Sequence, residues 1–169
     1  MTLPRTRSFF ASDDVAHRHV VIKPSVLYFG TPVSLISTLN EDGSANLASM
    51  SSSWYLGGTI VLGIGDSGQT ILNLRREPGF VLNLPSAAQH AAVERLAPLT
   101  GRHPVPEAKR ARFRYEPAKL AAAGLTEQAS DLVRAPRVAE CPVQLEAIVQ
   151  ALHPPVVHDR RGPRAAAPR

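Results

Sequence analysis

Residues suited to binding chemistry concentrate between positions 32 and 85 of this 169-residue sequence. A serine cluster follows a strand-like segment there, and its last member precedes Trp54, the only tryptophan. Serine hydroxyls can hydrogen-bond phosphate or ring carbonyl oxygens, and a tryptophan offers a flat apolar wall. Runs of serine are also common in linkers, so a plain polar loop is the alternative. The binding interpretation predicts a site for a flat cofactor with a phosphate, formed by Ser49, Ser51, Ser52, Ser53 and Trp54.

A glycine-rich turn, GIGDSG at residues 63–68, matches the pattern G-x-G-x-x-G between a predicted strand and a predicted helix. A dinucleotide-binding fold would need an acidic residue about 20 positions later and a parallel crossover. The sequence instead reads LNLP at residues 82–85, and the preceding elements resemble a hairpin. We therefore interpret the turn as a helix start. Its free backbone amides and Thr70 favour a phosphate, and an ordinary capped turn is the alternative.

Other catalytic chemistries lack their motifs. No G-x-S-x-G motif surrounds a serine, and the six histidines are scattered without the spacing of a metal site. The single cysteine, Cys141, excludes an internal disulfide and is expected to be a structural thiol. The 32–85 segment also contains few acids, and none of them form an evident pair. We expect no catalytic side chain and no metal, with a cofactor supplying the chemistry.

The positive charge is concentrated at the C-terminus. Residues 153–169 contain four arginines and one aspartate, which leaves 15 basic and 13 acidic residues elsewhere. No aromatic residues interleave with those arginines, so nucleic-acid binding is not expected, and the segment is predicted to be a disordered basic tail. The N-terminus lacks the apolar centre of a signal peptide, and no apolar run reaches the roughly 18 residues of a membrane span. We expect a soluble, cytoplasmic protein without a membrane partner.

The elements that position these residues follow from hydrophobic periodicity and turn signals. Asp42-Gly43 is typical of a tight hairpin turn, and the continuous apolar run 59–64 favours a central, buried strand. Small residues in the strand 44–50 suggest that something bulky lies against it. Residues 1–152 are predicted to form one mainly β domain with an N-terminal entry segment and small peripheral helices. The predicted strands are 26–29, 33–39, 44–50, 59–64, 80–84 and 143–152, and the predicted helical segments are 69–77, 87–96, 106–111 and 117–123.

A series of short motifs resembles the flavin reductase-like, FMN-binding split-barrel family, which includes flavoredoxin-like proteins. The resemblance covers residues 24–150 and is spread over many short matches. Its order is a strand ending in Ser-Thr, an Asp-Gly hairpin, a small-residue strand, a serine turn before an aromatic residue, a Thr-Asn helix and a Phe-Val-x-Asn strand. The matching residues are Ser37-Thr38, Asp42-Gly43, Asn46-Leu47-Ala48, Ser51 to Trp54, Thr70 to Asn73 and Phe80 to Asn83.

The resemblance implies a six-stranded antiparallel Greek-key split barrel, usually a homodimer, with FMN, or alternatively FAD, near the subunit interface. It implies that Asn46, Leu47, Ala48 and Ser49 line the edge of the flavin ring. It further implies that Ser51, Ser53 and Thr70 contact the ribityl chain and phosphate, and that Asn83 lies near the ring. The whole predicted cofactor site is Ser37, Thr38, Asn46, Leu47, Ala48, Ser49, Ser51, Ser52, Ser53, Trp54, Thr70 and Asn83.

The function implied by the resemblance is an NAD(P)H:flavin oxidoreductase in which hydride passes from nicotinamide to the flavin, with a partner oxygenase as a further expectation. One alternative is an electron-transfer flavoprotein that holds FMN without turning over nicotinamide. Another is a truncated member with weak flavin binding. Relatives usually continue beyond a strand like 143–152 into at least one more strand, whereas this chain continues as HPPVVHDRRGPRAAAPR.

Overall fold

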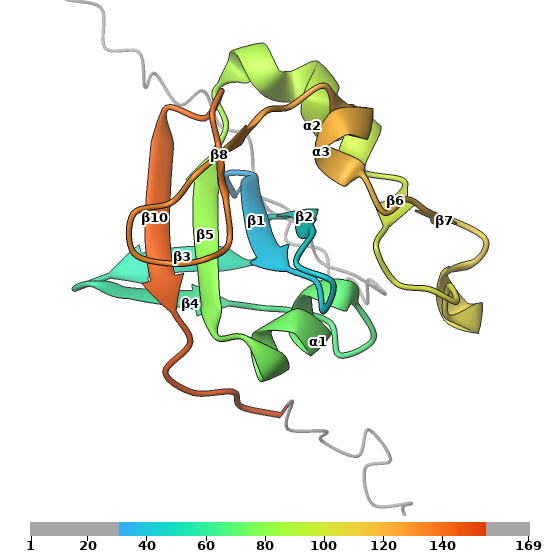
Figure 1. The fold of residues 1–169 in the computed structure, drawn as a ribbon, viewed down its shortest axis with the longest axis horizontal. Helices are drawn as coiled ribbons and strands as arrows, with labels where there is room; N and C mark the ends of the chain where they lie inside the picture. Colours follow the sequence, from blue (N-terminus) through green and yellow to red (C-terminus); the bar gives the residue numbers. More distant parts are fainter. Residues whose placement is uncertain (1–30, 155–169) are drawn as a thin grey trace, which may run out of the picture. The chain divides into compact units, whose positions relative to one another are not determined.

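A four-stranded antiparallel sheet forms the centre of the computed structural model, which describes residues 31–154 (Figure 1). The predicted strand 26–29, the entry segment and all but two residues of the predicted tail lie outside the described residues. The prediction of a mainly β fold with small helices is confirmed. The sheet has the order β10-β5-β1-β2 and consists of β1 (Ser34–Leu39), β2 (Ala45–Met50), β5 (Gly79–Leu84) and β10 (Val143–Ile148).

The hairpin between β1 and β2 is confirmed. Ser34 lies opposite Met50 and Leu39 lies opposite Ala45, so the two strands pair along their full length. Gly43 supplies the positive φ of the turn, at +83°. β2 is an edge strand of the sheet, and its second half borders the candidate site described below.

Both faces of the sheet carry a hydrophobic core because successive side chains of a strand point to opposite faces. On one face Leu35 and Leu47 pack with residues of two helices, α2 (His90–Leu96) and α3 (Lys119–Ala123). On the other face Ile36 packs with Leu74 of a third helix, α1 (Gln69–Arg76). The alternation explains why β1 is buried over its whole length.

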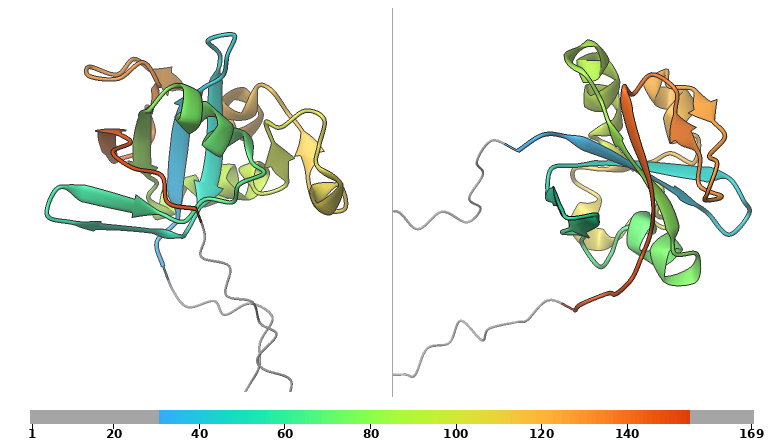
Figure 2. Two further views of the ribbon diagram at one scale, coloured as in Figure 1. Left: turned by 90° about the horizontal axis from the view of Figure 1, so that it is seen from below. Right: turned by 90° about the vertical axis from the view of Figure 1, so that its left-hand side faces the viewer.

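The hairpin of β3 (Ser53–Leu56) and β4 (Thr59–Leu62) is separate from the central sheet and reaches beyond it (Figure 2). The prediction of a central, buried strand at 59–64 is therefore wrong. Ile60 and Leu62 pack against the core that contains Ile36, whereas Val61 is exposed. A continuous apolar run is compatible with a strand that is buried on both faces. It is equally compatible with a strand such as β4, which has apolar residues on one buried face and on one exposed face.

The predicted helical segments are confirmed, with shorter extents. α1 ends at Arg76, and Gly124, with φ +68°, ends α3. A 3₁₀ turn, capped by Ser86, precedes α2. The predicted strand 143–152 ends at Ile148. The remaining elements are the 3₁₀ turns Ala87–Gln89 and Glu107–Lys109 and four two-residue strands, β6 (Leu99–Thr100), β7 (Arg114–Tyr115), β8 (Glu127–Gln128) and β9 (Arg137–Val138).

The six-stranded Greek-key split barrel that the resemblance implies is not joined into one sheet by backbone hydrogen bonds within residues 31–154. These residues form the four-stranded sheet and three two-stranded pairs, β3–β4, β6–β7 and β8–β9. The β3–β4 hairpin instead crosses the direction of the sheet strands (Figure 1). A hydrogen bond between the hydroxyls of Ser34 and Ser53, 2.9 Å long, ties the hairpin to β1. No helix among the described residues has the length and apolar character needed to cross a membrane.

Candidate functional site

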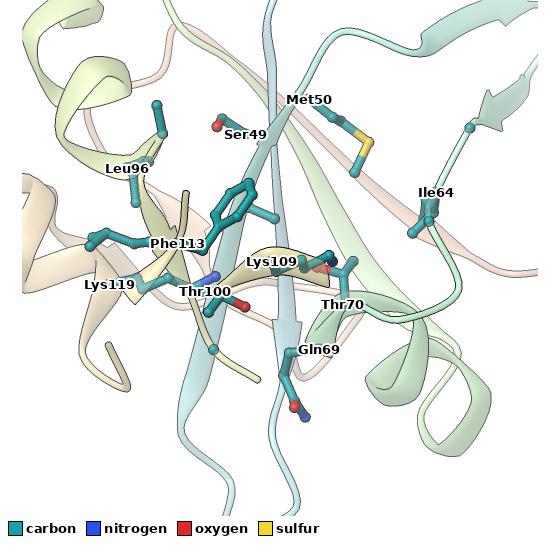
Figure 3. A pocket seen from close by; sticks show the side chains of 17 residues that line it. Ser49, Met50, Ile64, Gln69, Thr70, Leu96, Thr100, Lys109, Phe113 and Lys119 are labelled. Carbon is teal, nitrogen blue, oxygen red and sulfur yellow. The ribbon is translucent and has the colours of Figure 1, made fainter. Parts of the chain in front are cut away.

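A recess of about 240 Å³ lies where the edge of β2 meets the start of α1 and the 96–119 region (Figure 3). Three chain segments form most of its wall: Ala48–Met50 at the end of β2, residues 63–70 and residues 96–101. Three side chains from further along the chain complete it. They are Lys109, Phe113 and Lys119.

Small residues open the recess at the sheet edge. Ala48 and Ser49 are half-buried where β2 leaves the core, and both line the recess. Gly63, Gly65 and Gly68, the three glycines of the G-x-G-x-x-G segment, line it from the other side. Because none of these residues has a bulky side chain, the backbone of both segments is accessible to a ligand.

A buried amide and hydroxyl network holds the start of α1 against the sheet. The Asn46 side-chain nitrogen donates to the Thr38 hydroxyl at 3.1 Å and to the Thr70 hydroxyl at 3.2 Å. The Asn73 side-chain nitrogen also donates to the Thr38 hydroxyl, at 3.0 Å, and to the Asn40 side-chain oxygen, at 2.9 Å. These bonds join β1, β2 and α1, and so they position the helix N-terminus at the recess.

The side-chain oxygen of Asn46 is buried and has no hydrogen-bond partner among the described residues. It lies against Gly101, which lines the recess: a β-carbon added to Gly101 would be 2.5 Å from this oxygen. Buried acceptors are normally satisfied, and leaving one unpaired costs about 1–3 kcal/mol. A ligand or water molecule that donates a hydrogen bond from the recess would satisfy this oxygen.

Four of the sequence-predicted residues are brought to the recess. Ala48, Ser49 and Thr70 line it, and Asn46 borders it through its bond to Thr70. Leu47 is fully buried in the core with α2 and α3 and does not line the recess.

Three predicted residues are instead fully buried behind the sheet edge. The Asn83 side-chain nitrogen donates to the Leu35 carbonyl and to the Ser37 hydroxyl, both at 3.1 Å, and its oxygen accepts from the Val138 backbone at 2.9 Å. Ser37 donates to the Pro136 carbonyl. Thr38 belongs to the Asn46 network. These residues tie strands and loops together and do not line the recess.

The serine turn also lies beside the recess rather than in its wall. Ser51 is half-buried, Ser52 is exposed, and Ser53 bonds to Ser34. Trp54 lies on the protruding hairpin with 56% of its surface exposed. It therefore forms no wall of this recess within the described chain.

Sequence reasoning missed the two lysines of the recess. Lys119 is only 3% exposed, and burial, followed by the charge of Lys109, lowers its pKa to about 8. The terminal nitrogen of Lys109 lies 6.0 Å from the centre of the Phe113 ring. The local sequence AKLAAAG gave no signal, because lysine is usually exposed and its burial here arises from the packing of α3 on α2 and β2.

The lining of the recess limits its chemistry. It contains two lysines but no aspartate, glutamate or histidine, so it holds no carboxylate or imidazole for general acid–base catalysis. In the described chain no cluster of three or more histidine, cysteine, aspartate or glutamate side chains could hold a metal ion. Positive charge beside apolar side chains suits an anionic ligand that also has an apolar part.

Comparison with known proteins gives a family and a relative. The sequence profile of the "Flavin reductase like domain" family matches residues 26–159. The Bacillus subtilis (strain 168) protein YdfE, described as uncharacterized, is 44% identical over 135 residues. That match covers 79% of this chain and 65% of YdfE, so the chain spans about two thirds of the length of this curated relative.

Two solved structures share the fold. Flavoredoxin of Desulfovibrio vulgaris (Miyazaki F) has a TM-score of 0.64 and 20% identity, covering 80% of this chain and 68% of its own. Nitrilotriacetate monooxygenase component B from Bacillus cereus has a TM-score of 0.60 and 17% identity, covering 80% and 70%. At such identities the likeness concerns the fold alone. Since the family profile matches most of its length, this chain belongs to the flavin reductase like domain family.

Proposed function

We propose that the recess binds a flavin, FMN in the first instance, and that the protein is an NAD(P)H:flavin oxidoreductase. The observation that carries the proposal is a recess lined by two lysines and several small residues but no acid or imidazole, in a member of this family. When bound, a flavin supplies the redox chemistry by accepting hydride from a reduced nicotinamide. The protein then has to bind and orient its two ligands.

The residues present fit such a ligand. Ala48 and Ser49 offer backbone and small side chains to the ring edge, and the orphaned Asn46 oxygen is an acceptor close by. Thr70 and the start of α1 suit the phosphate side. In this proposal Leu47, Ser37, Thr38 and Asn83 support the site from behind, whereas Ser51, Ser52, Ser53 and Trp54 could reach only the part of a flavin that extends beyond the recess.

A second copy of the chain is proposed to complete the site. The recess, at about 240 Å³, is smaller than the roughly 300–1,000 Å³ of sites that enclose drug-sized ligands. The nearby β3–β4 hairpin exposes Trp54, Tyr55 and Leu56, a grouping that indicates an interaction surface. A homodimer in which this hairpin covers the partner's recess would bury the exposed apolar side chains of the hairpin and enclose the recess.

The six-stranded Greek-key barrel is retained as part of the proposal. The central sheet and the β3–β4 hairpin together contain six antiparallel strands, and Ile60 and Leu62 cover the core between them. An organisation as one domain over residues 1–152 with a separate tail, and a cytoplasmic location, are proposed on the sequence. Similarity in fold to a monooxygenase component supports a partner oxygenase as the acceptor of reduced flavin.

The test is to mix the purified full chain with FMN or FAD and then with NADH or NADPH, following absorbance at 340 nm and in the flavin band. Loss of nicotinamide absorbance that requires both protein and flavin supports the oxidoreductase. Stoichiometric flavin binding without that loss supports the electron-transfer alternative. A protein that binds neither flavin at micromolar concentration contradicts both functions.

A further inference from the structure

The basic residues of the described chain are concentrated on one excursion beside the recess. Residues 31–154 contain eleven lysines and arginines and eleven acids, but five of these basic residues and only one acid fall within residues 102–114. They are Arg102, Lys109, Arg110, Arg112 and Arg114, with Glu107 as the acid. This basic excursion runs from β6 into β7, and in Figure 1 it extends to one side of the central sheet. Its charge attracts an anionic ligand.

Two ring side chains at the ends of the basic excursion contact each other next to the recess. The ring centroids of His103 and Tyr115 are 4.7 Å apart, and the ring planes are tilted by 54°. Both residues are exposed, Tyr115 by 42%. Tyr115 lies opposite Thr100 in the β6–β7 pair, and Thr100 lines the recess. An exposed pair of rings beside a ligand site suits a nucleobase, because bases stack on aromatic side chains.

Arg102 adjoins both the recess and this pair of rings. Its backbone nitrogen donates to the Thr100 hydroxyl at 3.2 Å, and His103 is the next residue. Arg102 is half-buried, yet its guanidinium forms no ion pair or hydrogen bond among residues 31–154. The acid of the excursion, Glu107, pairs with Arg110 instead, at 2.6 Å. A guanidinium binds phosphate through two parallel hydrogen bonds, so this one suits a phosphate attached to a nucleoside.

We propose that Arg102, His103 and Tyr115 form an adenosine subsite that recognises a 2′-phosphate, so that the protein uses NADPH in preference to NADH. The two dinucleotides differ only in this phosphate, on the ribose of the adenosine half. The adenine packs on His103 and Tyr115, and the Arg102 guanidinium binds the 2′-phosphate. None of the three residues lines the recess, so the subsite is separate from the proposed flavin position. The inference rests on the proposed function for the reaction that consumes the dinucleotide.

The first test measures nucleotide binding to the full chain without flavin, by isothermal titration calorimetry at about 0.15 M salt, which screens distant charges. The probes are adenosine 2′,5′-bisphosphate, 5′-AMP and adenosine 3′,5′-bisphosphate, which has the charge of the first but a different phosphate position. We expect the 2′,5′-bisphosphate to bind about tenfold or more tightly than either of the others, as for hydrogen bonds to a charged group. Equal affinity for the two bisphosphates would overturn the subsite, because net charge alone would then explain binding.

Substitutions separate the two parts of the subsite. Arg102→Gln should weaken the 2′,5′-bisphosphate by about tenfold and leave 5′-AMP unchanged. Tyr115→Leu should weaken both nucleotides by about fivefold or more, through loss of stacking. Arg110→Gln is the matched control, since it removes an exposed arginine that already pairs with Glu107, and it should change neither. Circular dichroism checks that each variant is folded. Unchanged binding in Arg102→Gln or Tyr115→Leu, or an equal loss in Arg110→Gln, contradicts the assignment.

Steady-state kinetics with FMN test the consequence for the reaction. Wild type should show a KM for NADPH about tenfold or more below that for NADH, and Arg102→Gln should raise the KM for NADPH alone with kcat unchanged, because the contact is made equally before and during hydride transfer. Equal KM values overturn the subsite and leave the proposed function standing. If neither dinucleotide reduces flavin, the proposed function fails. The calorimetric preference for the 2′,5′-bisphosphate and its loss in Arg102→Gln then still support the subsite, and their absence overturns it.

Discussion

At the scale of single residues, Gly101 is the glycine of the recess at which an added β-carbon would come closest to another atom. Its α-carbon lies so close to Asn46 that an added β-carbon would be 2.5 Å from the Asn46 side-chain oxygen and 3.4 Å from Gln69. Asn46 also holds Thr70 and Thr38, so a displaced Asn46 would disturb the joint between β2 and α1. Glycine at this position therefore preserves the network that positions the helix.

Gly101→Ala is expected to lower the free energy of unfolding by about 1–3 kcal/mol, because a methyl group inserted into a packed site forces its neighbours to move. Urea denaturation measures the change. Gly65→Ala is the control, since an added β-carbon there has no atom within 4 Å. Equal stability of Gly101→Ala and wild type would show that the Asn46 network relaxes without penalty.

Lys119 gives a prediction in which the size of a stability change depends on pH. Its pKa is lowered to about 8 in the folded protein, against an ordinary value of 10.5. Below pH 8 folding buries a cation. Between pH 8 and 10.5 the unfolded chain binds more protons, so this residue makes the free energy of unfolding rise with pH. A buried amine of this kind lowers the stability of the ligand-free protein.

Lys119→Met should therefore make the ligand-free protein more stable at pH 7, by on the order of 2 kcal/mol, since one pKa unit corresponds to about 1.4 kcal/mol. The gain should shrink as the pH approaches 10, where wild-type Lys119 is neutral in the folded state. Urea titrations at pH 7 and pH 10 measure both values. A Met variant less stable than wild type at pH 7 would contradict this explanation.

At the scale of elements, Asn83 links three segments that are distant in sequence. From β5 it donates to Leu35 and Ser37 of β1 and accepts from Val138 of β9. These hydrogen bonds hold β1, β5 and β9 together, and the Asn83 side chain does not line the recess. A role in stability and a direct contact with the flavin make different predictions for this residue.

Asn83→Ala is expected to lower the free energy of unfolding by about 2–4 kcal/mol, because it leaves buried groups on β1 and β9 without partners. Flavin affinity, measured on the folded protein at low temperature, should change less than threefold. Gln150→Ala, which removes an exposed amide, serves as the control for stability. A large loss of affinity with unchanged stability would instead support the flavin contact expected from the sequence.

At the scale of the whole molecule, the β3–β4 hairpin is the feature that a lone chain does not explain. Three consecutive large apolar side chains, Trp54, Tyr55 and Leu56, are more than half exposed on it. Their inner neighbours Ile60 and Leu62 pack on the core, so the hairpin itself is anchored. An anchored element with an exposed apolar face is suited to association with a second chain.

Wild type should therefore elute as a dimer in size-exclusion chromatography with light scattering, and Trp54→Ser/Tyr55→Ser should shift it to monomer. Because the partner's hairpin is proposed to cover the recess, the variant should also bind flavin at least tenfold more weakly. Leu132→Ser is the matched control, since Leu132 is 83% exposed on a different loop. A monomeric wild type with full flavin affinity would rule out the shared site.

The sequence was sufficient where a local pattern has one structural solution. Asp42-Gly43 identified the hairpin, the Gln69–Arg76 helix followed its glycine turn, and the short motifs identified the family. It was not sufficient for the apolar run 59–64, because periodicity alone does not tell whether one face or both are covered. The same limit applies to Asn83 and Asn46, which have similar polarity, although only Asn46 borders the recess.

The sequence by itself thus determined the family and the mainly β architecture, and it predicted a site that includes Ala48, Ser49 and Thr70, which line one recess in the structure. These depend on local turn chemistry and on neighbouring strands. Only the tertiary structure decided that Lys109, Lys119 and the start of α1 line the same recess, and that the serine turn leads into a protruding hairpin. Burial and charge proximity arise from contacts between segments some 40–50 residues apart, which spacing along the chain does not encode.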